Sequence, residues 1–137
     1  MPHTRRRLIQ SALALPALPA VLAQKTGQGK QQGRTEAAFL HHVYFWLADP
    51  DSPAARKEFL AELNKMRAIP GIRHSFIGTP AADPRDVVDN SFTYYWQVAF
   101  DDKNAWKVYD QHPIHDGFRK KSALWKKVQI YDTLRVD

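Results

Sequence analysis

Hydrophobic and polar positions alternate along four stretches of the chain, and stretches with helical spacing lie between them. The first stretch, residues 39–47, is predicted to be a strand with two apolar or aromatic faces. These faces carry Val43, Phe45 and Leu47 on one side and His42, Tyr44 and Trp46 on the other. Because neither side is purely polar, we expect both sides of this strand to be covered by other parts of the protein.

A capping residue and a proline mark the first helix. Ser52 stands directly before Pro53, which is the pattern of an N-cap followed by proline in the first turn. Apolar residues then repeat at helical spacing until Ile69-Pro70-Gly71. They are Phe59, Leu60, Leu63 and Met66. We therefore predict a helix here, followed by a strand over residues 72–79 and a loop over residues 80–90.

The second half of the chain repeats this order. Residues 91–100 are predicted to be a strand whose one face carries Phe92, Tyr94, Trp96, Val98 and Phe100. Asp101-Asp102 is expected to cap a helix that runs through Tyr109. His112-Pro113 breaks this helix, because the residue before a proline is driven out of helical geometry, and a further helical piece follows. The last strand is predicted over residues 127–136.

The predicted element order, β-α-β-β-α-β, is that of an α+β domain of the ferredoxin-like class. Both helices then pack on one side of a four-stranded antiparallel sheet and leave the other side open. The open side would carry His42, Tyr44, Trp46 and Tyr95. This is more aromatic surface than a monomer leaves in water. We therefore expect a homodimer in which two sheets face each other across a two-fold axis and enclose a dimeric α+β barrel.

The N-terminal residues have the order of an export signal. The Arg5-Arg6 pair precedes an apolar run over residues 11–23 that ends in small residues. This run is shorter than the roughly 20 apolar residues of a membrane-spanning helix and contains prolines, so no permanent membrane anchor is expected. The arginine pair resembles a twin-arginine signal, and a general secretory signal is the alternative. We predict a signal peptide over residues 1–23, a disordered linker over 24–37, one domain over 38–137, and a periplasmic or secreted location.

Charge is distributed unevenly along the chain. Residues 1–34 contain six basic and no acidic side chains, whereas residues 35–137 contain 14 of each, so the formal charges of the domain cancel. The net charge of +6 therefore comes from the leader and the linker, and the domain is not expected to bind nucleic acid. The sequence contains no cysteine, which excludes disulfides and thiolate metal ligands.

The helix break holds the candidate chemistry. Tyr109, His112 and His115 place a phenol and two imidazoles around it, and such groups transfer protons near neutral pH. A structural interpretation stays open beside this one. In that interpretation His112 bonds to the backbone where the helix ends, and His115 caps the next turn. His41 and His74 are given no functional role.

Several short motifs resemble those of the stress-responsive A/B barrel (Dabb) domains, which belong to the dimeric α+β barrel superfamily. The resemblance covers about residues 39–136. The motifs are His42-Val43, Ile69-Pro70-Gly71-Ile72, Tyr109 with His112-Pro113-Ile114-His115, Phe118, and Ile130-Tyr131-Asp132. The resemblance implies a homodimeric barrel. It implies less about activity, since the family includes plant stress proteins without an established activity as well as a polyketide cyclase, olivetolic acid cyclase.

Two functions follow from this resemblance. The first is an exported homodimer whose small apolar-walled cleft binds a small apolar or aromatic molecule without turnover. The second is a cyclase or lyase in which His115 is the base and Tyr109 the donor to an oxyanion, with His42 nearby, since the pocket of the cyclase uses matching residues. The ligand pocket is expected to include Tyr44, Trp46, Tyr95 and His112. The bulky first strand, the longer loop at residues 80–90 and the export signal depart from the cyclase.

Neither a metal nor a cofactor is predicted. His42, His112 and His115 are the candidates for a metal site, but the last two lack the i, i+4 spacing of a zinc-binding helix. Haem is the remaining alternative, with His115 or His42 as its axial ligand in a monooxygenase of the wider superfamily.

Replacing both Arg5 and Arg6 with lysine tests the export route. A twin-arginine signal requires the pair, whereas a general secretory signal needs only positive charge, so we expect the double variant to stay in the cytoplasm. Cell fractionation measures the mature protein in the periplasm. The control Arg7→Lys should be exported normally, and an unchanged periplasmic yield of the double variant would indicate the general pathway.

Overall fold

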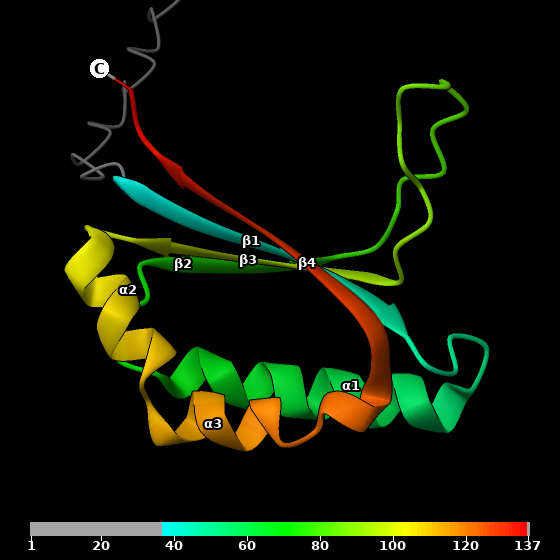
Figure 1. Cartoon of the computed structure of the whole chain (residues 1–137), viewed down its shortest axis with the longest axis horizontal. Coiled ribbons are helices and arrows are strands. Elements are labelled where there is room, and N and C mark those ends of the chain that lie inside the picture. The colour runs from blue at the N-terminus through cyan, green and yellow to red at the C-terminus, as the bar shows by residue number, and fades with distance from the viewer. Residues whose placement is uncertain (1–36, 137) are drawn as a thin grey trace, which may run out of the picture. The chain divides into compact units, whose positions relative to one another are not determined.

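The computed structural model describes residues 37–136, which form an α+β domain around one four-stranded antiparallel sheet (Figure 1). Its strands are β1 (Phe39–Leu47), β2 (His74–Gly78), β3 (Tyr94–Phe100) and β4 (Trp125–Leu134). Its helices are α1 (Pro53–Lys65), α2 (Lys103–Asp110) and α3 (Pro113–Arg119), and the single turns η1 (Met66–Ala68) and η2 (Ser122–Leu124) are 3₁₀ helices. The ferredoxin-like element order predicted from the sequence is confirmed, with the second helix broken in two. The predicted signal peptide and nearly all of the predicted linker lie outside the described residues.

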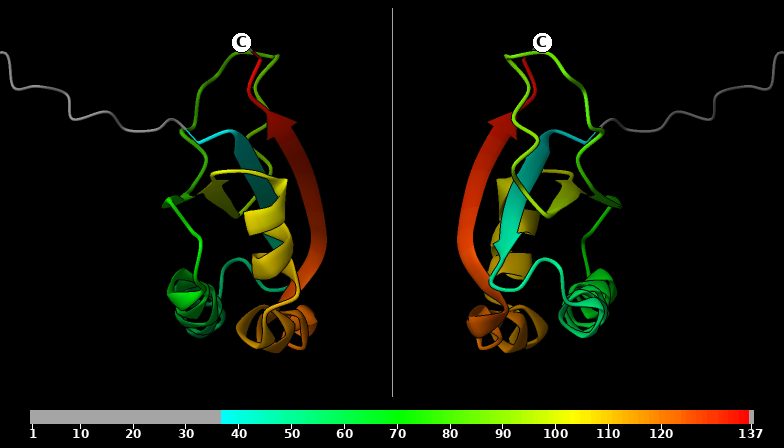
Figure 2. Two further views of the ribbon diagram at one scale, coloured as in Figure 1. Left: turned by 90° about the vertical axis from the view of Figure 1, so that its left-hand side faces the viewer. Right: turned by 90° about the vertical axis from the view of Figure 1, so that its right-hand side faces the viewer.

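The strands lie in the order β2-β3-β1-β4, with every neighbouring pair antiparallel. All three α-helices lie on the same side of the sheet, and the loop that connects β2 to β3 projects on the other side (Figure 1). The side views in Figure 2 show α1 and α3 next to each other beneath the sheet, with β4 at its edge. Among these helices, none in the part of the chain that the structure describes is long and apolar enough to cross a membrane.

The core lies between the sheet and the helices. Residues of β1 alternate between buried and half-buried along its whole length, and the buried ones face the helices. In the sheet register Val43 stands between Trp96 of β3 and Ile130 of β4, so the same face continues across three strands. The largest fully buried side chains are Trp96, Tyr109, Phe59, Phe100, Leu47, Leu63, Met66 and Val98. The chain has no disulfide, and burial of this largely aromatic core stabilises the domain.

Each helix begins at a side-chain cap that the sequence supplies. The hydroxyl of Ser52 accepts a hydrogen bond from the N–H of Ala55 at 3.2 Å, and Pro53 follows in the first turn. The carboxylate of Asp102 accepts from the N–H of Ala105 at 2.8 Å and starts α2. Gly71 adopts a φ of 88° between η1 and β2, a conformation that favours glycine.

The predicted start of the third strand was wrong. Strand β3 begins at Tyr94, and the ring of Phe92 lies 5.0 Å from that of Tyr44, on the open side of the sheet. The reason lies in Thr93, whose hydroxyl accepts the N–H of Leu47 at 3.1 Å. The Thr93 hydroxyl takes the place of a backbone carbonyl in the hydrogen-bond ladder between β1 and β3, so the regular pairing of these strands ends here. Strand alternation therefore no longer determines which face of the sheet Phe92 lies on. The second strand is likewise shorter than predicted, and the last strand begins two residues earlier.

Candidate functional site

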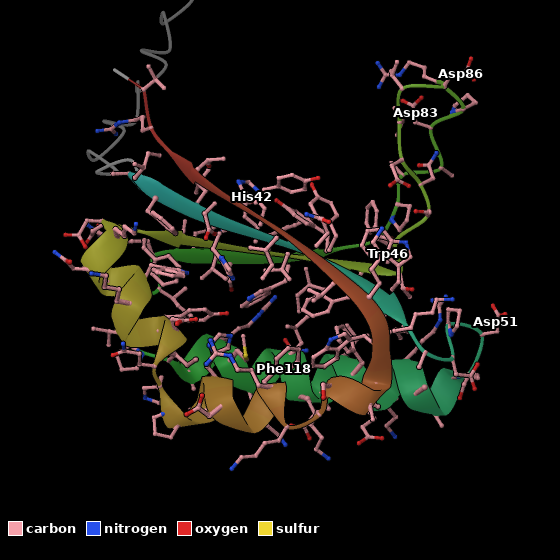
Figure 3. All side chains as sticks on the ribbon, in the orientation of Figure 1. His42, Trp46, Asp51, Asp83, Asp86 and Phe118 are labelled. Carbon is pink, nitrogen blue, oxygen red and sulfur yellow. The ribbon has the colours of Figure 1, made fainter. Side chains whose placement is uncertain are left out.

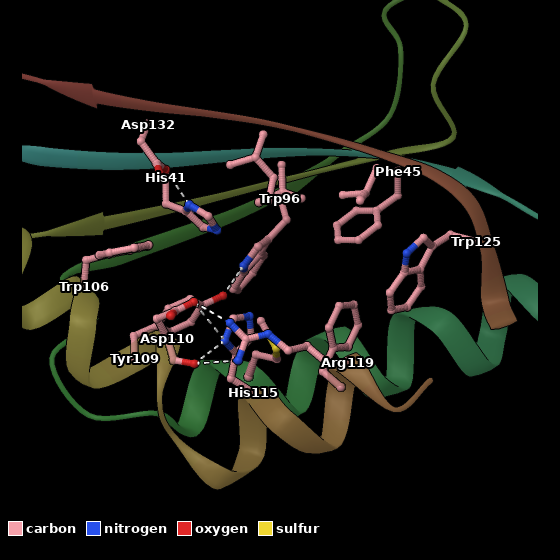
Figure 4. Close-up of a pocket in the computed structure, with 15 residues that line it drawn as sticks. His41, Phe45, Trp96, Trp106, Tyr109, Asp110, His115, Arg119, Trp125 and Asp132 are labelled. Atoms are coloured by element: carbon pink, nitrogen blue, oxygen red, sulfur yellow. Dashed lines mark hydrogen bonds and ion pairs between the residues drawn. The ribbon is translucent and has the colours of Figure 1, made fainter. Parts of the chain in front are cut away.

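A cavity of about 260 Å³ lies between the helix-facing side of the sheet and helices α2 and α3 (Figure 4). Most of its wall is apolar, formed by Val43, Phe45, Met66, Trp96, Trp106, Phe118, Trp125, Val128 and Ile130. Its polar side chains are His41, Tyr109, Asp110, His115, Arg119 and Asp132. Val128 and Ile130 are 42% and 46% exposed, so the cavity opens to solvent along β4.

Tyr109 and His115 lie side by side in this cavity. Their ring centres are 4.7 Å apart, and the side chains come from the two helices that meet at Pro113. Trp96 donates its indole N–H to the phenol oxygen of Tyr109 at 3.0 Å, which holds the phenol in place. The hydroxyl proton of Tyr109 has no acceptor within residues 37–136, so Tyr109 can donate it to a ligand.

The backbone fixes the tautomer of His115. Its Nδ1 lies 2.9 Å from the carbonyl oxygen of Asp110, and a carbonyl can only accept a hydrogen bond. Nδ1 therefore carries the proton and Nε2 carries the lone pair. Burial lowers the pKa of His115 below its ordinary value, so this imidazole is neutral at pH 7. Burial raises the pKa of the Tyr109 phenol, which keeps the phenol protonated. The pair thus offers a base beside a hydrogen-bond donor.

A second imidazole enters the cavity from the sheet. Nδ1 of His41 lies 2.6 Å from a carboxylate oxygen of Asp132 on the neighbouring strand, directly opposite in the register. Because a carboxylate oxygen can only accept a hydrogen bond, Nδ1 of His41 carries a proton and donates it to Asp132. Nε2 of His41 is then available to a ligand in the cavity. The ring centre of His41 is 6.0 Å from that of Tyr109. Tyr109 is therefore close to an imidazole on the sheet as well as one on α3.

One buried donor in the wall lacks a partner. The indole Nε1 of Trp106 is buried and makes no hydrogen bond in the described part of the chain. A buried donor without an acceptor costs free energy, and a ligand oxygen that reached Trp106 would remove that cost.

His42 does not belong to this cavity, and the expectation that it lies near Tyr109 and His115 is corrected. Successive residues of a strand point to opposite sides, so His42 faces away from the helices whereas His41 faces them. Figure 3 shows His42 and Trp46 above the sheet and Phe118 below it. Nδ1 of His42 and the hydroxyl of Tyr95 form a hydrogen bond of 2.6 Å, and burial raises the pKa of Tyr95 to about 12.

The predicted pocket residues separate in the same way. Tyr44, Trp46 and Tyr95 line a different hollow of about 480 Å³ on the open side of the sheet, beside the loop between β2 and β3. His112 lines neither hollow. It is the N-cap of α3, and its Nδ1 accepts the N–H of Ile114 at 3.2 Å, as the structural interpretation of this histidine expected.

Sequence reasoning missed His41 and Asp132 as members of the site. The signal that identifies His41 is the alternation of β1, since a strand that turns Val43 and Phe45 toward the helices turns His41 the same way. Asp132 can be placed on the helix-facing side only when the register of β4 against β1 is known, because it stands opposite His41. The partners Asp110 and Arg119 depend on how α2 meets α3, which no short pattern specifies.

The cavity offers few ligands for a metal ion. Within residues 37–136, no group of three or more histidines and carboxylates is placed to hold one. The volume of about 260 Å³ is below the about 300–1,000 Å³ that is typical of pockets for drug-sized ligands. A cavity of this size suits a small molecule.

Comparison with known proteins gives one family and a consistent fold. The sequence model of the stress-responsive A/B barrel domain matches residues 39–134. A Dabb family protein with a ferredoxin-like fold from Mesorhizobium loti is 23% identical, covers 74% of this chain and 100% of its own, and superposes with a TM-score of 0.62. No match was found among curated proteins.

Two further solved structures share the fold at lower identity. Hydroxynitrile lyase from Passiflora edulis is 14% identical, with 74% of this chain and 96% of its own covered and a TM-score of 0.64. A dimeric ferredoxin-like protein of unknown function from Thermobifida fusca is 15% identical, with 73% and 92% covered and a TM-score of 0.60.

Removing the hydroxyl of Tyr109 should destabilise the domain. In Tyr109→Phe the buried indole N–H of Trp96 loses its acceptor, so we expect the free energy of unfolding to fall by about 1–3 kcal/mol in urea denaturation. Tyr94→Phe is the matched control, because Tyr94 packs in the same core but its hydroxyl makes no hydrogen bond within residues 37–136. An equal loss in both variants would show that the Trp96 hydrogen bond is not the cause.

Proposed function

The chain belongs to the family of stress-responsive A/B barrel domains, and from that premise we propose that it is an acid–base enzyme of the lyase or cyclase type, acting on a small uncharged molecule. The observation that carries this proposal is the position of Tyr109 and His115. Both line one cavity, and neither is consumed by a backbone cap: His115 uses only Nδ1 toward Asp110, and Tyr109 keeps its proton for donation.

The walls of the cavity indicate the kind of ligand. Aromatic and aliphatic side chains dominate, which favours a flat apolar body. Arg119 is the one permanently cationic residue in the wall, and it is already held by the carboxylates of Asp110 and Asp116. A carboxylate ligand would meet Asp110 and Asp132 without a free cation to bind it. These features favour an uncharged compound that carries a carbonyl or hydroxyl oxygen.

The proposed chemistry is proton removal beside a carbonyl. The lone pair on Nε2 of His115 takes the proton from the carbon, the C–H electron pair becomes a carbon–carbon double bond, and the carbonyl electrons move to oxygen. The hydroxyl of Tyr109 donates a hydrogen bond to that oxyanion. His41, oriented by Asp132, is a second group that can exchange a proton with the ligand. The imidazolium of His115 then returns its proton to the product.

Binding without turnover is the competing function. It is supported by the mixed activities of the family and by a cavity that would hold a small apolar molecule whether or not it reacts.

The Passiflora edulis protein is a hydroxynitrile lyase with the same fold, and this adds support for lyase chemistry on such a scaffold. A haem-dependent monooxygenase receives less support, because the cavity is small.

We further propose that the protein is a homodimer joined through the open side of its sheet. This side carries a group of aromatic side chains in mutual contact, which we call the open-face cluster: Tyr44, Trp46, Phe76, Phe92, Tyr95 and Tyr131. Phe76 and Tyr131 are 50% and 57% exposed in the single chain. Apolar surface of this kind is usually covered by a partner, and the related Thermobifida fusca protein is described as dimeric.

Export is part of the proposal. The order of charged, apolar and small residues over residues 1–23 supports a periplasmic or secreted location. A twin-arginine route would carry the domain across the membrane already folded, which suits a protein whose stability comes from a core rather than from disulfides.

Hydrogen–deuterium exchange of a small ketone tests the enzymatic function. Acetophenone in D₂O loses its methyl proton signal in NMR as a base exchanges those protons, and we expect the wild-type protein to accelerate this over buffer. His115→Gln should lose the acceleration, and Tyr109→Phe should reduce it about 10²-fold. His74→Gln is the matched control, since His74 is exposed on β2 outside the cavity. If wild type and His115→Gln exchange equally, the protein binds without turnover or uses other chemistry.

A single charge in the open-face cluster tests the dimer. Tyr131→Glu changes a side chain that is exposed in one chain, so the fold should survive while burial of the carboxylate between two sheets becomes too costly. We expect sedimentation velocity to show a monomer for this variant and a dimer for wild type. Val108→Glu places the same charge on the exposed side of α2 and should remain dimeric. A dimeric Tyr131→Glu protein would place the interface elsewhere.

A further inference from the structure

A backbone carbonyl at the junction between α2 and α3 binds the imidazole of His115. Asp110 is the last residue of α2, and the next two N–H groups bond to the carbonyls of Lys107 and Tyr109. The carbonyl of Asp110 is thereby left for side chains of α3. His115 donates its Nδ1–H to it at 2.9 Å, and Arg119 donates an Nη1–H to the same oxygen at 2.9 Å.

Arg119 holds the carboxylate of Asp110 as well as its carbonyl. The two α3 side chains are four residues apart and so lie on one face of the helix. The second guanidinium nitrogen of Arg119 donates to the carboxylate of Asp110, and the first also reaches the carboxylate of Asp116 at 3.0 Å. The same Asp110 carboxylate lies 3.7 Å from Nδ1 of His115. The Asp110 carboxylate therefore has Arg119 and His115 within reach, and Arg119 is the one that binds it (Figure 4).

We propose that Arg119 is a positioning residue that keeps the lone pair on Nε2 of His115 available to a ligand in the cavity. By binding the Asp110 carboxylate, Arg119 prevents Asp110 from forming an ion pair with a protonated His115. By binding the Asp110 carbonyl, it fixes the acceptor that sets the His115 tautomer. The proposal rests on the proposed function where it treats His115 as the base, but the ionisation of His115 can be measured without any ligand.

The charges around His115 support this role. Burial is the largest influence and lowers the pKa of His115, the bond to the Asp110 carbonyl raises it, the positive charge of Arg119 lowers it, and the Asp110 carboxylate raises it. His41 of β1 also lowers the pKa, and it is itself bound to Asp132 of β4.

The remaining neighbours change this balance little. Tyr109 of α2 stays a neutral phenol beside His115, and the η1 turn contributes Met66, which has no charge. On α3 itself, the Asp116 carboxylate is bound to Arg119. Loss of Arg119 removes a positive charge and frees a negative one, and both changes favour the imidazolium. An opposite charge within about 4–6 Å moves a pKa by about 1–3 units.

The test is an NMR titration of the histidine side chains in protein with ¹³C-labelled histidine, with the His115 signal assigned by its absence in His115→Gln. In wild type we expect a pKa below the ordinary value near 6.5. In Arg119→Gln it should rise by about one unit or more. Adding Asp110→Asn should bring it back toward the wild-type value, because the freed carboxylate is then absent. Arg119→Met, which keeps the aliphatic stem, should behave like Arg119→Gln.

A matched control separates this effect from a general loss of surface charge. Arg73 forms an exposed ion pair with Asp101 outside the cavity, so Arg73→Gln should leave the His115 titration unchanged. If both Arg119 variants stay folded by circular dichroism and the His115 pKa does not rise, the proposal is overturned.

The ketone exchange assay distinguishes this proposal from the proposed function. If both hold, Arg119→Gln should be slow at neutral pH and regain activity above the raised pKa. A raised pKa in a protein that never accelerates exchange would uphold the role of Arg119 and reject the enzymatic function. If wild type accelerates exchange but the His115 pKa is unchanged in Arg119→Gln, the enzymatic function is upheld and the role of Arg119 is rejected.

Discussion

The break in the chain at Pro113 is the constraint on which the site depends. Proline lacks an N–H and drives the residue before it out of helical geometry, so α2 ends and α3 begins within two residues. The last carbonyl of α2 is consequently not used inside a helix, and it binds His115 instead. Tyr109, one residue earlier, is fully buried against Trp96. The break at Pro113 thus places the side chains of His115 and Tyr109 next to each other.

The sheet then separates two surfaces with different chemistry. Alternation along β1 sends one set of side chains to the cavity and the other to the open-face cluster, and a shift of one residue would exchange them. His41 and His42 show the consequence, since adjacent histidines bind Asp132 on one side and Tyr95 on the other. The proposed chemistry inside the domain and the proposed association through its open face therefore involve different residues of the same strand.

Most of the fold could be predicted from the sequence, because caps, prolines and alternation are local signals. The bounds of β1, the Ser52 and Asp102 caps and the break before Pro113 all follow from them. The start of β3 could not, because the Thr93 hydroxyl replaces a ladder carbonyl. Within the candidate site, Tyr109 and His115 were predicted and line one cavity. The choice of His42 over His41 came from the family resemblance, although the alternation of the strand already placed His42 on the open side. The Asp110–Arg119 contact depends on tertiary geometry alone.

The charged residues of the cavity are better explained by orientation than by stability. Arg119, Asp110 and Asp132 are between a third and a half exposed in their side chains, and ion pairs with that exposure contribute little to folding. The aromatic core stabilises the domain without them. Yet each of the two carboxylates acts at an imidazole. Asp132 binds His41 directly, and Asp110 binds Arg119 beside His115. A domain selected for stability alone would fill this space with apolar side chains. The cavity, in which His41 is held by Asp132 and His115 by the Asp110 carbonyl, therefore supports the proposed proton transfer.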